Sequence, residues 1–166
     1  MRKYLKMAVV IGAVVFLLIQ AWRPDRTNPP VVTSHRMEAQ LDVPQNVEAI
    51  LSRACADCHS NGTHWPWYTN VSPVSWFVAG HIQGGRSHMN FSEWDSVKTQ
   101  TWWKRNGLQQ ICTEIQSGGM PLTSYLLIHW NAKLSSEDVR IVCEWTELAR
   151  QQTQTGSATG ADTTPK

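Results

Sequence analysis

Residues 44–60 have the sequence PQNVEAILSRACADCHS, in which an apolar helical pattern leads directly into a cluster of Cys and His residues. Pro44 can begin a helix, because a first-turn residue needs no N–H donor. The spacing of three and four residues that marks one helix face is then kept by Val47, Ile50, Leu51 and Ala54. We therefore predict a helix that runs straight into Cys55.

The pentapeptide Cys55-Ala56-Asp57-Cys58-His59 is a C-x-x-C-H sequence, the pattern of covalent haem attachment. Two Cys three residues apart on a helical turn project from one face, so both sulfurs can reach the vinyl groups along one haem edge. The imidazole of His59 can then bind the iron as the proximal ligand. We predict one covalent haem c, attached through Cys55 and Cys58 and ligated by His59.

Three other functions of this Cys pair stay open at this point. A thioredoxin-type C-x-x-C requires a βαβ setting, and the sequence predicts no strand. A disulfide between Cys55 and Cys58 would constrain almost no loop. A zinc site would need a further ligand, such as Cys112, Cys143 or another His, and those two Cys stand singly rather than as a second C-x-x-C pair.

Met120 is the predicted ligand on the other side of the iron. Haem iron in electron-transfer proteins often takes a Met opposite the His. Met120 lies in Gly118-Gly119-Met120-Pro121, where the Gly residues allow close backbone approach and Pro121 fixes the chain beyond it. The rival ligands are Met89, His64, His81, His88 and His129.

Residues 1–22 have a basic start, with Arg2, Lys3 and Lys6, followed by the uncharged run MAVVIGAVVFLLIQAW at residues 7–22. This pattern is typical of a secretion signal or a membrane anchor. No A-x-A cleavage pattern follows, so we predict an uncleaved transmembrane anchor that contacts the membrane through residues 4–22. Basic residues stay on the cytoplasmic side, which places the rest of the chain outside. A cleaved signal is the alternative.

The remaining chain divides by composition. Residues 23–41 contain three of the eight Pro residues and no apolar periodicity, which predicts a flexible tether. Residues 151–166 are small and polar, which predicts a disordered tail. The globular domain is therefore predicted at residues 42–150.

Three further helices are predicted in this domain, and no strand. One begins at Ser72-Pro73 and ends at Gly84-Gly85, and another covers about residues 101–116 and ends before Gly118-Gly119. The last begins at Ser135, with Asp138 at the capping-box position. The predicted fold class is all-α: a small helical domain with long functional loops, behind the amino-terminal anchor.

Cys112 and Cys143 lie on two of these predicted helices, beside their apolar faces. In an oxidising compartment they can form a disulfide, and two buried thiols are the alternative. The nine Trp residues suit either a flat apolar cofactor or ordinary core packing. Candidate donors to haem propionates, by residue type alone, are Arg86, Trp65, Trp67 and Tyr68.

The charge balance excludes one class of partner. Three of the 15 Lys and Arg residues lie within residues 1–6, and the other 12, from Arg23 onward, nearly balance the 13 Asp and Glu. A near-neutral body offers no electrostatic basis for binding nucleic acid, so none is expected as a partner.

Several segments together resemble the bacterial haem-binding domain family of cytochrome c-like proteins. They are Cys55–Asn61, Trp65–Tyr68, Ser72–Trp76, Asn90–Trp94, Gly119–Pro121, Tyr125, His129, Leu134–Ser135 and the helix near Trp145. The resemblance covers about 100 residues. It implies a mono-haem c-type domain behind a membrane segment, with Met120-Pro121 as the distal motif, although Gly119 and Leu122 differ from the family pattern. It also implies a bacterial inner-membrane protein with its haem domain in the periplasm.

These features predict an electron carrier rather than an enzyme, exchanging electrons with redox partner proteins through a His/Met-ligated haem. A haem-based sensor with a displaceable Met120 is the alternative. Peroxidase-like activity would require acid–base groups beside an open iron, for which His81 and His88 are the available residues. A zinc-stabilised adhesion domain is the alternative without redox chemistry.

Overall fold

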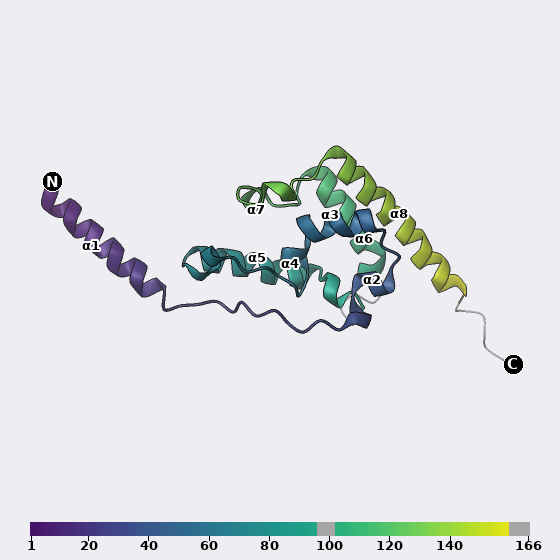
Figure 1. Ribbon diagram of the computed structural model, residues 1–166, viewed down its shortest axis with the longest axis horizontal. Helices are drawn as coiled ribbons and strands as arrows, with labels where there is room; N and C mark the ends of the chain where they lie inside the picture. The colour runs from purple at the N-terminus through teal and green to yellow at the C-terminus, as the bar shows by residue number, and fades with distance from the viewer. Residues whose placement is uncertain (96–101, 160–166) are drawn as a thin grey trace.

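The computed structural model describes residues 1–95 and 102–159, and within these ranges the chain forms helices and no strand (Figure 1). This confirms the predicted all-α class for the described residues. The α-helices are α1 Arg2–Ile19, α2 Met37–Gln40, α3 Gln45–Ala54, α4 Ala56–His59, α5 Val74–His88, α6 Trp102–Ser117, α7 Thr123–Leu126 and α8 Ser136–Thr159. Short 3-10 helices are η1 Thr33–His35, η2 Trp67–Asn70, η3 Phe91–Glu93 and η5 Trp130–Ala132.

The core of the domain lies where α6 and α8 pack on each other and α3 packs on α8 (Figure 1). Each helix contributes apolar side chains that are almost fully buried: Val47 from α3, Leu108 from α6 and Val142 from α8. A disulfide between Cys112 and Cys143 joins α6 to α8, with the two Cα atoms 4.9 Å apart. The core therefore holds the helix that leads into the C-x-x-C-H sequence.

The domain begins earlier than the predicted boundary at Asp42. Met37 and Leu41 lie in the same apolar core, and Met37 is only 1% exposed. The Trp145 indole N–H of α8 also donates to the Asp42 carbonyl at 2.9 Å. Core packing thus continues into residues that the composition assigns to a tether.

Residues upstream of Met37 are also held against the domain instead of forming a free tether. The Gln20 amide pairs with the backbone N–H and carbonyl of Ser72, at 2.9 and 3.1 Å. The Arg26 guanidinium donates to the Thr69 carbonyl at 3.0 Å. A segment rich in Pro and polar residues can follow the surface of the domain in this way, because its backbone and side-chain polar groups form hydrogen bonds with that surface without packing into the core.

α1 contains the apolar run of the predicted anchor. No helix within residues 1–95 and 102–159 is long and apolar enough to cross a membrane, so the predicted transmembrane anchor at residues 1–22 is not supported.

The helix boundaries follow the sequence closely at α3 and less closely at α5. α5 begins just after Ser72-Pro73, as predicted, but it continues through Gly84 and Gly85 to His88. Both Gly residues accept helical backbone geometry, so the pair does not end the helix. α6 ends at Ser117, as its Gly residues predict; the predicted start at Thr101 lies outside the described residues.

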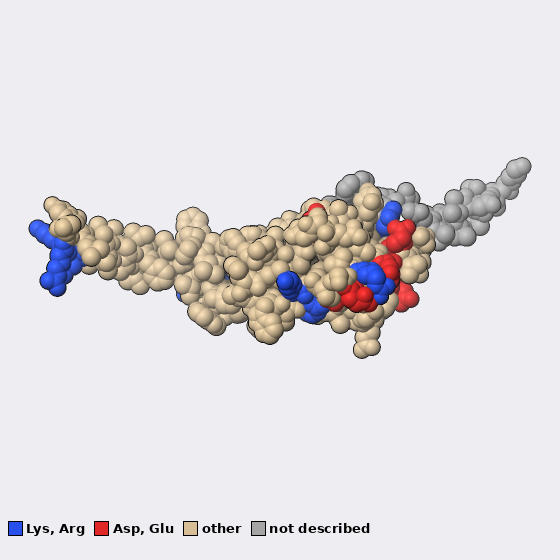
Figure 2. Space-filling model, turned by 90° about the horizontal axis from the view of Figure 1, so that it is seen from above, with Lys and Arg blue, Asp and Glu red and all other residues tan. Residues whose placement is uncertain are grey.

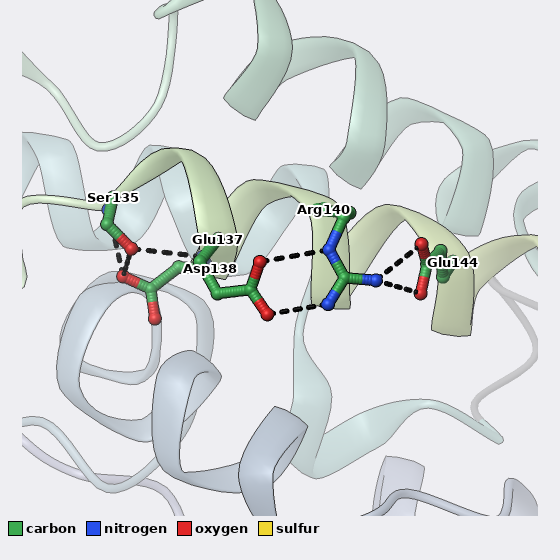
Figure 3. A network of polar contacts seen from close by, with 5 residues as sticks. All are labelled: Ser135, Glu137, Asp138, Arg140 and Glu144. Atoms are coloured by element: carbon green, nitrogen blue, oxygen red, sulfur yellow. Dashed lines mark hydrogen bonds and ion pairs between the residues drawn. The ribbon is translucent and has the colours of Figure 1, made fainter.

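α8 begins with the predicted capping box (Figure 3). The Ser135 hydroxyl accepts the Asp138 N–H at 3.1 Å, and the Asp138 carboxylate accepts the Ser135 N–H at 2.8 Å. Arg140 then bridges Glu137 and Glu144 along the exposed face. The helix continues to Thr159, into the predicted tail, of which residues 160–166 lie outside the described ranges.

Charged residues are unevenly distributed over the molecule. Residues 60–85 and 115–132 contain no Lys, Arg, Asp or Glu. Figure 2 shows basic side chains at the start of α1 and mixed charges at the opposite end of the domain, with mostly uncharged surface between them. The two uncharged segments contribute α7 and all of α5 before Arg86, and both helices border the site described below.

The disulfide should contribute substantially to the stability of the domain. Replacing both Cys112 and Cys143 by Ala should lower the free energy of unfolding by about 3–4 kcal/mol, because the unfolded chain loses a covalent loop of 31 residues. Chemical denaturation of the oxidised proteins measures this difference. Wild-type protein unfolded under reducing conditions should approach the variant; equal stability of the variant and the oxidised wild type would contradict the prediction.

Candidate functional site

Two adjoining cavities lie between the α4–α5 region and the segment that follows α6. Their volumes are about 590 and 270 Å³. They share five lining residues: Ala54, His59, His88, Met120 and Pro121. The two cavities therefore adjoin along these residues, and we call the pair the cleft; its size is typical of a site for a bound organic cofactor.

All four predicted haem residues line this cleft. Cys58 borders the larger cavity and Cys55 the smaller one, whereas His59 and Met120 border both. Met120 also packs against the apolar core of the domain. The fold thus brings a Met from beyond α6 to the same space as the C-x-x-C-H turn.

The positions of Cys55 and Cys58 argue against a thioredoxin-type function. Burial raises the pKa of Cys55 to about 12 and that of Cys58 to about 11, and the charge of Asp57 adds to the second shift. Redox-active C-x-x-C motifs need a lowered thiol pKa to supply the thiolate. Both residues are free thiols here, so the alternative Cys55–Cys58 disulfide is not formed.

A zinc site also lacks its ligands. Within the described part of the chain, no three His, Cys, Asp or Glu side chains gather closely enough to hold a metal ion. Cys112 and Cys143, the proposed additional ligands, are joined to each other in the disulfide.

The orientation of His59 suits an iron ligand. Its Nδ1 lies 3.0 Å from the Met89 carbonyl oxygen, which can only accept, so Nδ1 carries the proton and donates. The ring also stacks on Phe91, with 5.9 Å between centroids. Burial lowers the pKa of His59, which favours the neutral imidazole. Nε2 therefore retains its lone pair, and a backbone hydrogen bond orients the ring, as in many metal-ligating His residues.

Gly85 allows α5 to lie directly on the C-x-x-C-H turn. A Cβ atom at this position would stand 2.6 Å from the Cys58 carbonyl oxygen and 3.1 Å from its carbon. Neighbouring Gly84 has nothing within 4 Å of a Cβ. The Gly pair was predicted to end the helix. The sequence feature that could have indicated a close contact is the presence of two Gly residues inside a segment that could otherwise continue as a helix.

The chain turns sharply between α6 and Met120. Gly118 has a φ of +73°, in the left-handed region that Gly accepts without strain. The Met120 N–H then donates to the Glu114 carbonyl at 3.2 Å. This turn directs Met120, Pro121 and Leu122 along the larger cavity.

Two residues of the site were not singled out as functional from the sequence. The Tyr125 hydroxyl, at the larger cavity, donates to the Asp57 carboxylate at 2.8 Å. Burial, followed by the hydrogen bond to Asp57, raises the pKa of Tyr125, so its hydroxyl stays protonated. Asp57 occupies a variable position of C-x-x-C-H, where the motif itself gives no reason to expect a role.

The rival ligands divide into two groups. His81 borders the larger cavity, Met89 the smaller one, and His88 borders both. His64 and His129 border neither and instead line a third cavity of about 210 Å³, which adjoins the larger one at residues that include His81 and Tyr125. The cleft thus retains three rivals to Met120.

Two of the candidate propionate donors lie away from the cleft, and two of the Trp residues lie in the core. Arg86 and Trp65 both donate to the Asn28 side chain, at 2.8 and 3.1 Å, and neither borders the cleft. Trp76 borders the larger cavity, whereas Trp94 and Trp145 belong to the core. Core packing therefore accounts for these two, and Trp76 suits a cofactor wall.

Comparison with known proteins gives one match. A family model described as a haem-binding domain matches residues 14–148, which is most of the chain. None of the curated proteins and none of the solved structures compared with the chain matches it.

The contact at Gly85 can be tested against its neighbour. Gly85→Ala should lower the free energy of unfolding by about 1–3 kcal/mol, because the new methyl group overlaps the Cys58 backbone. Gly84→Ala should instead raise it by up to about 1 kcal/mol, because Ala favours the helix and has free space. Thermal unfolding of both variants measures the difference, and equal effects would contradict the assigned contact.

Proposed function

This chain belongs to the haem-binding domain family, and on that premise we propose that it is a mono-haem c-type cytochrome that transfers electrons. The observation that carries the proposal is the position of Cys55, Cys58, His59 and Met120 around two adjoining cavities. Two thiols, an imidazole and a thioether together match the attachment and ligation chemistry of haem c.

Covalent attachment is assigned to Cys55 and Cys58. Each thiol would add across one vinyl group of haem and form a thioether, with the thiol hydrogen passing to the vinyl carbon.

His59 and Met120 are the proposed axial ligands. Haem supplies the iron that alternates between ferric and ferrous states. His59 would offer Nε2, because its other ring nitrogen donates to the Met89 carbonyl, and Met120, which lines the same two cavities, would offer its sulfur. His/Met ligation gives a higher reduction potential than two His ligands would.

The surroundings of the cleft favour electron transfer over catalysis. Its lining is mainly apolar, with Phe77, Leu122 and Ile111 among the side chains. The disulfide between α6 and α8 fixes the helix that leads to Met120. A site held in this way would change little when the iron changes charge.

We place the haem domain on the outer side of the bacterial inner membrane. A Cys112–Cys143 disulfide is the kind of bond that persists in an oxidising compartment, and covalent attachment prevents loss of haem there. The proposed partners are redox proteins, with no role for nucleic acid. A haem-based sensor with a displaceable Met120 is the second candidate.

Haem attachment is tested by removing both motif thiols. Wild-type protein exported together with haem-maturation machinery should retain haem after denaturation and extraction, and should show a c-type spectrum in alkaline pyridine. The Cys55→Ala/Cys58→Ala variant should retain no haem after denaturation and extraction, because neither thioether can form.

A matched control uses the other two cysteines. The Cys112→Ala/Cys143→Ala variant should keep covalent haem, because its thiols lie outside the cleft. Absence of bound haem from correctly exported wild-type protein would overturn the proposed function.

The assignment of Met120 is tested with variants of conserved volume. Met120→Leu should abolish the weak long-wavelength band of ferric iron bonded to sulfur and lower the reduction potential on the order of 0.1 V, within the roughly 0.8 V range that axial ligands span. Met89→Leu should keep both properties, because the Met89 backbone carbonyl still orients His59. A band that survives in Met120→Leu and disappears in Met89→Leu would assign the ligand to Met89.

Carbon monoxide separates the carrier from the sensor. Reduced wild-type protein should bind it slowly if Met120 holds the sixth position, and rapidly if that position opens readily. Rapid binding by the wild type would favour the sensor.

A further inference from the structure

Residues 120–130, which we call the distal arm, pack on the apolar core at Met120 and contain no buried residue beyond it. Figure 1 shows α7 at the tip of this arm, which leaves the α6–α8 end of the domain and returns to it. No residue of α7 is buried, and Leu127 and Trp130 are 78% and 81% exposed. Apolar burial therefore contributes little to holding the outer part of the arm in place.

Polar contacts hold the distal arm instead. The Tyr125 hydroxyl donates to the Asp57 carboxylate at 2.8 Å, which joins the arm to the C-x-x-C-H turn. Four residues further on, the His129 ring stacks on Tyr125, with 4.0 Å between centroids, and its Nε2 lies 3.2 Å from the Tyr68 hydroxyl. Of these contacts, only the first bonds to the turn that carries His59.

Asp57 is itself firmly placed. Its carboxylate accepts the His64 N–H at 3.1 Å, and its carbonyl accepts the Thr63 hydroxyl at 2.6 Å. Thr63 is buried and accepts a hydrogen bond from Arg86. Tyr125 is therefore hydrogen-bonded to a residue of the C-x-x-C-H turn that is itself held in place by other hydrogen bonds.

From this geometry we infer that Tyr125 is a positioning residue that holds Met120 in the sixth coordination position by latching the distal arm to Asp57. This inference rests on the proposed function. A thioether is a weak iron ligand whose occupancy depends on how closely its backbone is confined. Met120 is confined upstream by α6, and the Tyr125–Asp57 hydrogen bond confines the chain five residues downstream.

Tyr125→Phe tests the latch by removing one oxygen atom and retaining the ring that stacks on His129. In the haem-loaded protein, amide hydrogen exchange within residues 120–129 should accelerate at least about tenfold, the order expected on loss of one hydrogen bond to a charged group. Reduced protein should bind carbon monoxide faster by a similar factor. The ferric iron–sulfur band should weaken and the reduction potential should fall.

Thr146→Val provides a matched control for general loss of stability. Thr146 is buried on α8, where its hydroxyl donates to the Cys143 carbonyl at 2.8 Å, and it does not border the cleft. Removing this hydroxyl should destabilise the fold and leave the iron–sulfur band, the potential and the carbon monoxide rate unchanged. Equal changes in both variants would overturn the inference.

A second variant distinguishes loss of the Tyr125–Asp57 hydrogen bond from other structural effects of changing Tyr125. Asp57→Asn removes the carboxylate and retains side-chain volume. Because a latch requires both partners, the Tyr125→Phe/Asp57→Asn double variant should bind carbon monoxide no more than about twice as fast as the faster single variant. Effects that multiply independently would overturn the inference.

Failure of the latch is distinguishable from failure of the proposed function. Unchanged exchange, spectrum and carbon monoxide rate in a haem-loaded Tyr125→Phe protein would overturn the latch and leave the cytochrome proposal intact. Absence of covalent haem or of the iron–sulfur band from the wild type would overturn the proposed ligation itself, and with it the role of Tyr125 toward Met120.

Discussion

Gly85 brings the backbone of α5 into contact with the backbone of Cys58, and the geometry of the cleft depends on this approach. A Cβ atom there would stand 2.6 Å from the Cys58 carbonyl oxygen, so any side chain would push α5 away from α4. The consequences extend along α5, because Met89, immediately after its end, supplies the carbonyl that orients His59. The absence of a Cβ atom at Gly85 thus links the packing of α5 on α4 to the orientation of the His59 imidazole.

The sequence predicted those parts of the structure that depend on local chemistry. The apolar spacing before Cys55 gave α3, and the Ser135–Asp138 pair gave the start of α8. The four candidate haem residues were identified from C-x-x-C-H and from a Met-Pro step after two Gly, and the fold brings all four to one cleft. Each of these patterns has a physical reason that acts within a few residues.

Features that depend on contacts between distant segments were missed. Gly84-Gly85 has the composition of a helix end, and only the position of α4 explains why α5 continues through it. Arg86 was a candidate for an anionic group of the cofactor by residue type, but its donors are directed to Ser60, Thr27 and Asn28. The hydrogen bond between Tyr125 and Asp57 joins residues 68 positions apart, and neither residue type indicates from the sequence which distant residue it will contact.

The chain just after α1 is hydrogen-bonded to residues on either side of the start of α5. The Gln20 amide pairs with Ser72, and the Trp22 carbonyl accepts the Trp76 indole N–H. A loose linker would let the domain sample many orientations, with a working radius determined by linker length. Here, these hydrogen bonds restrict the orientation of α1 relative to the domain, so breaking them would increase the angular freedom of α1 without changing the length of the chain.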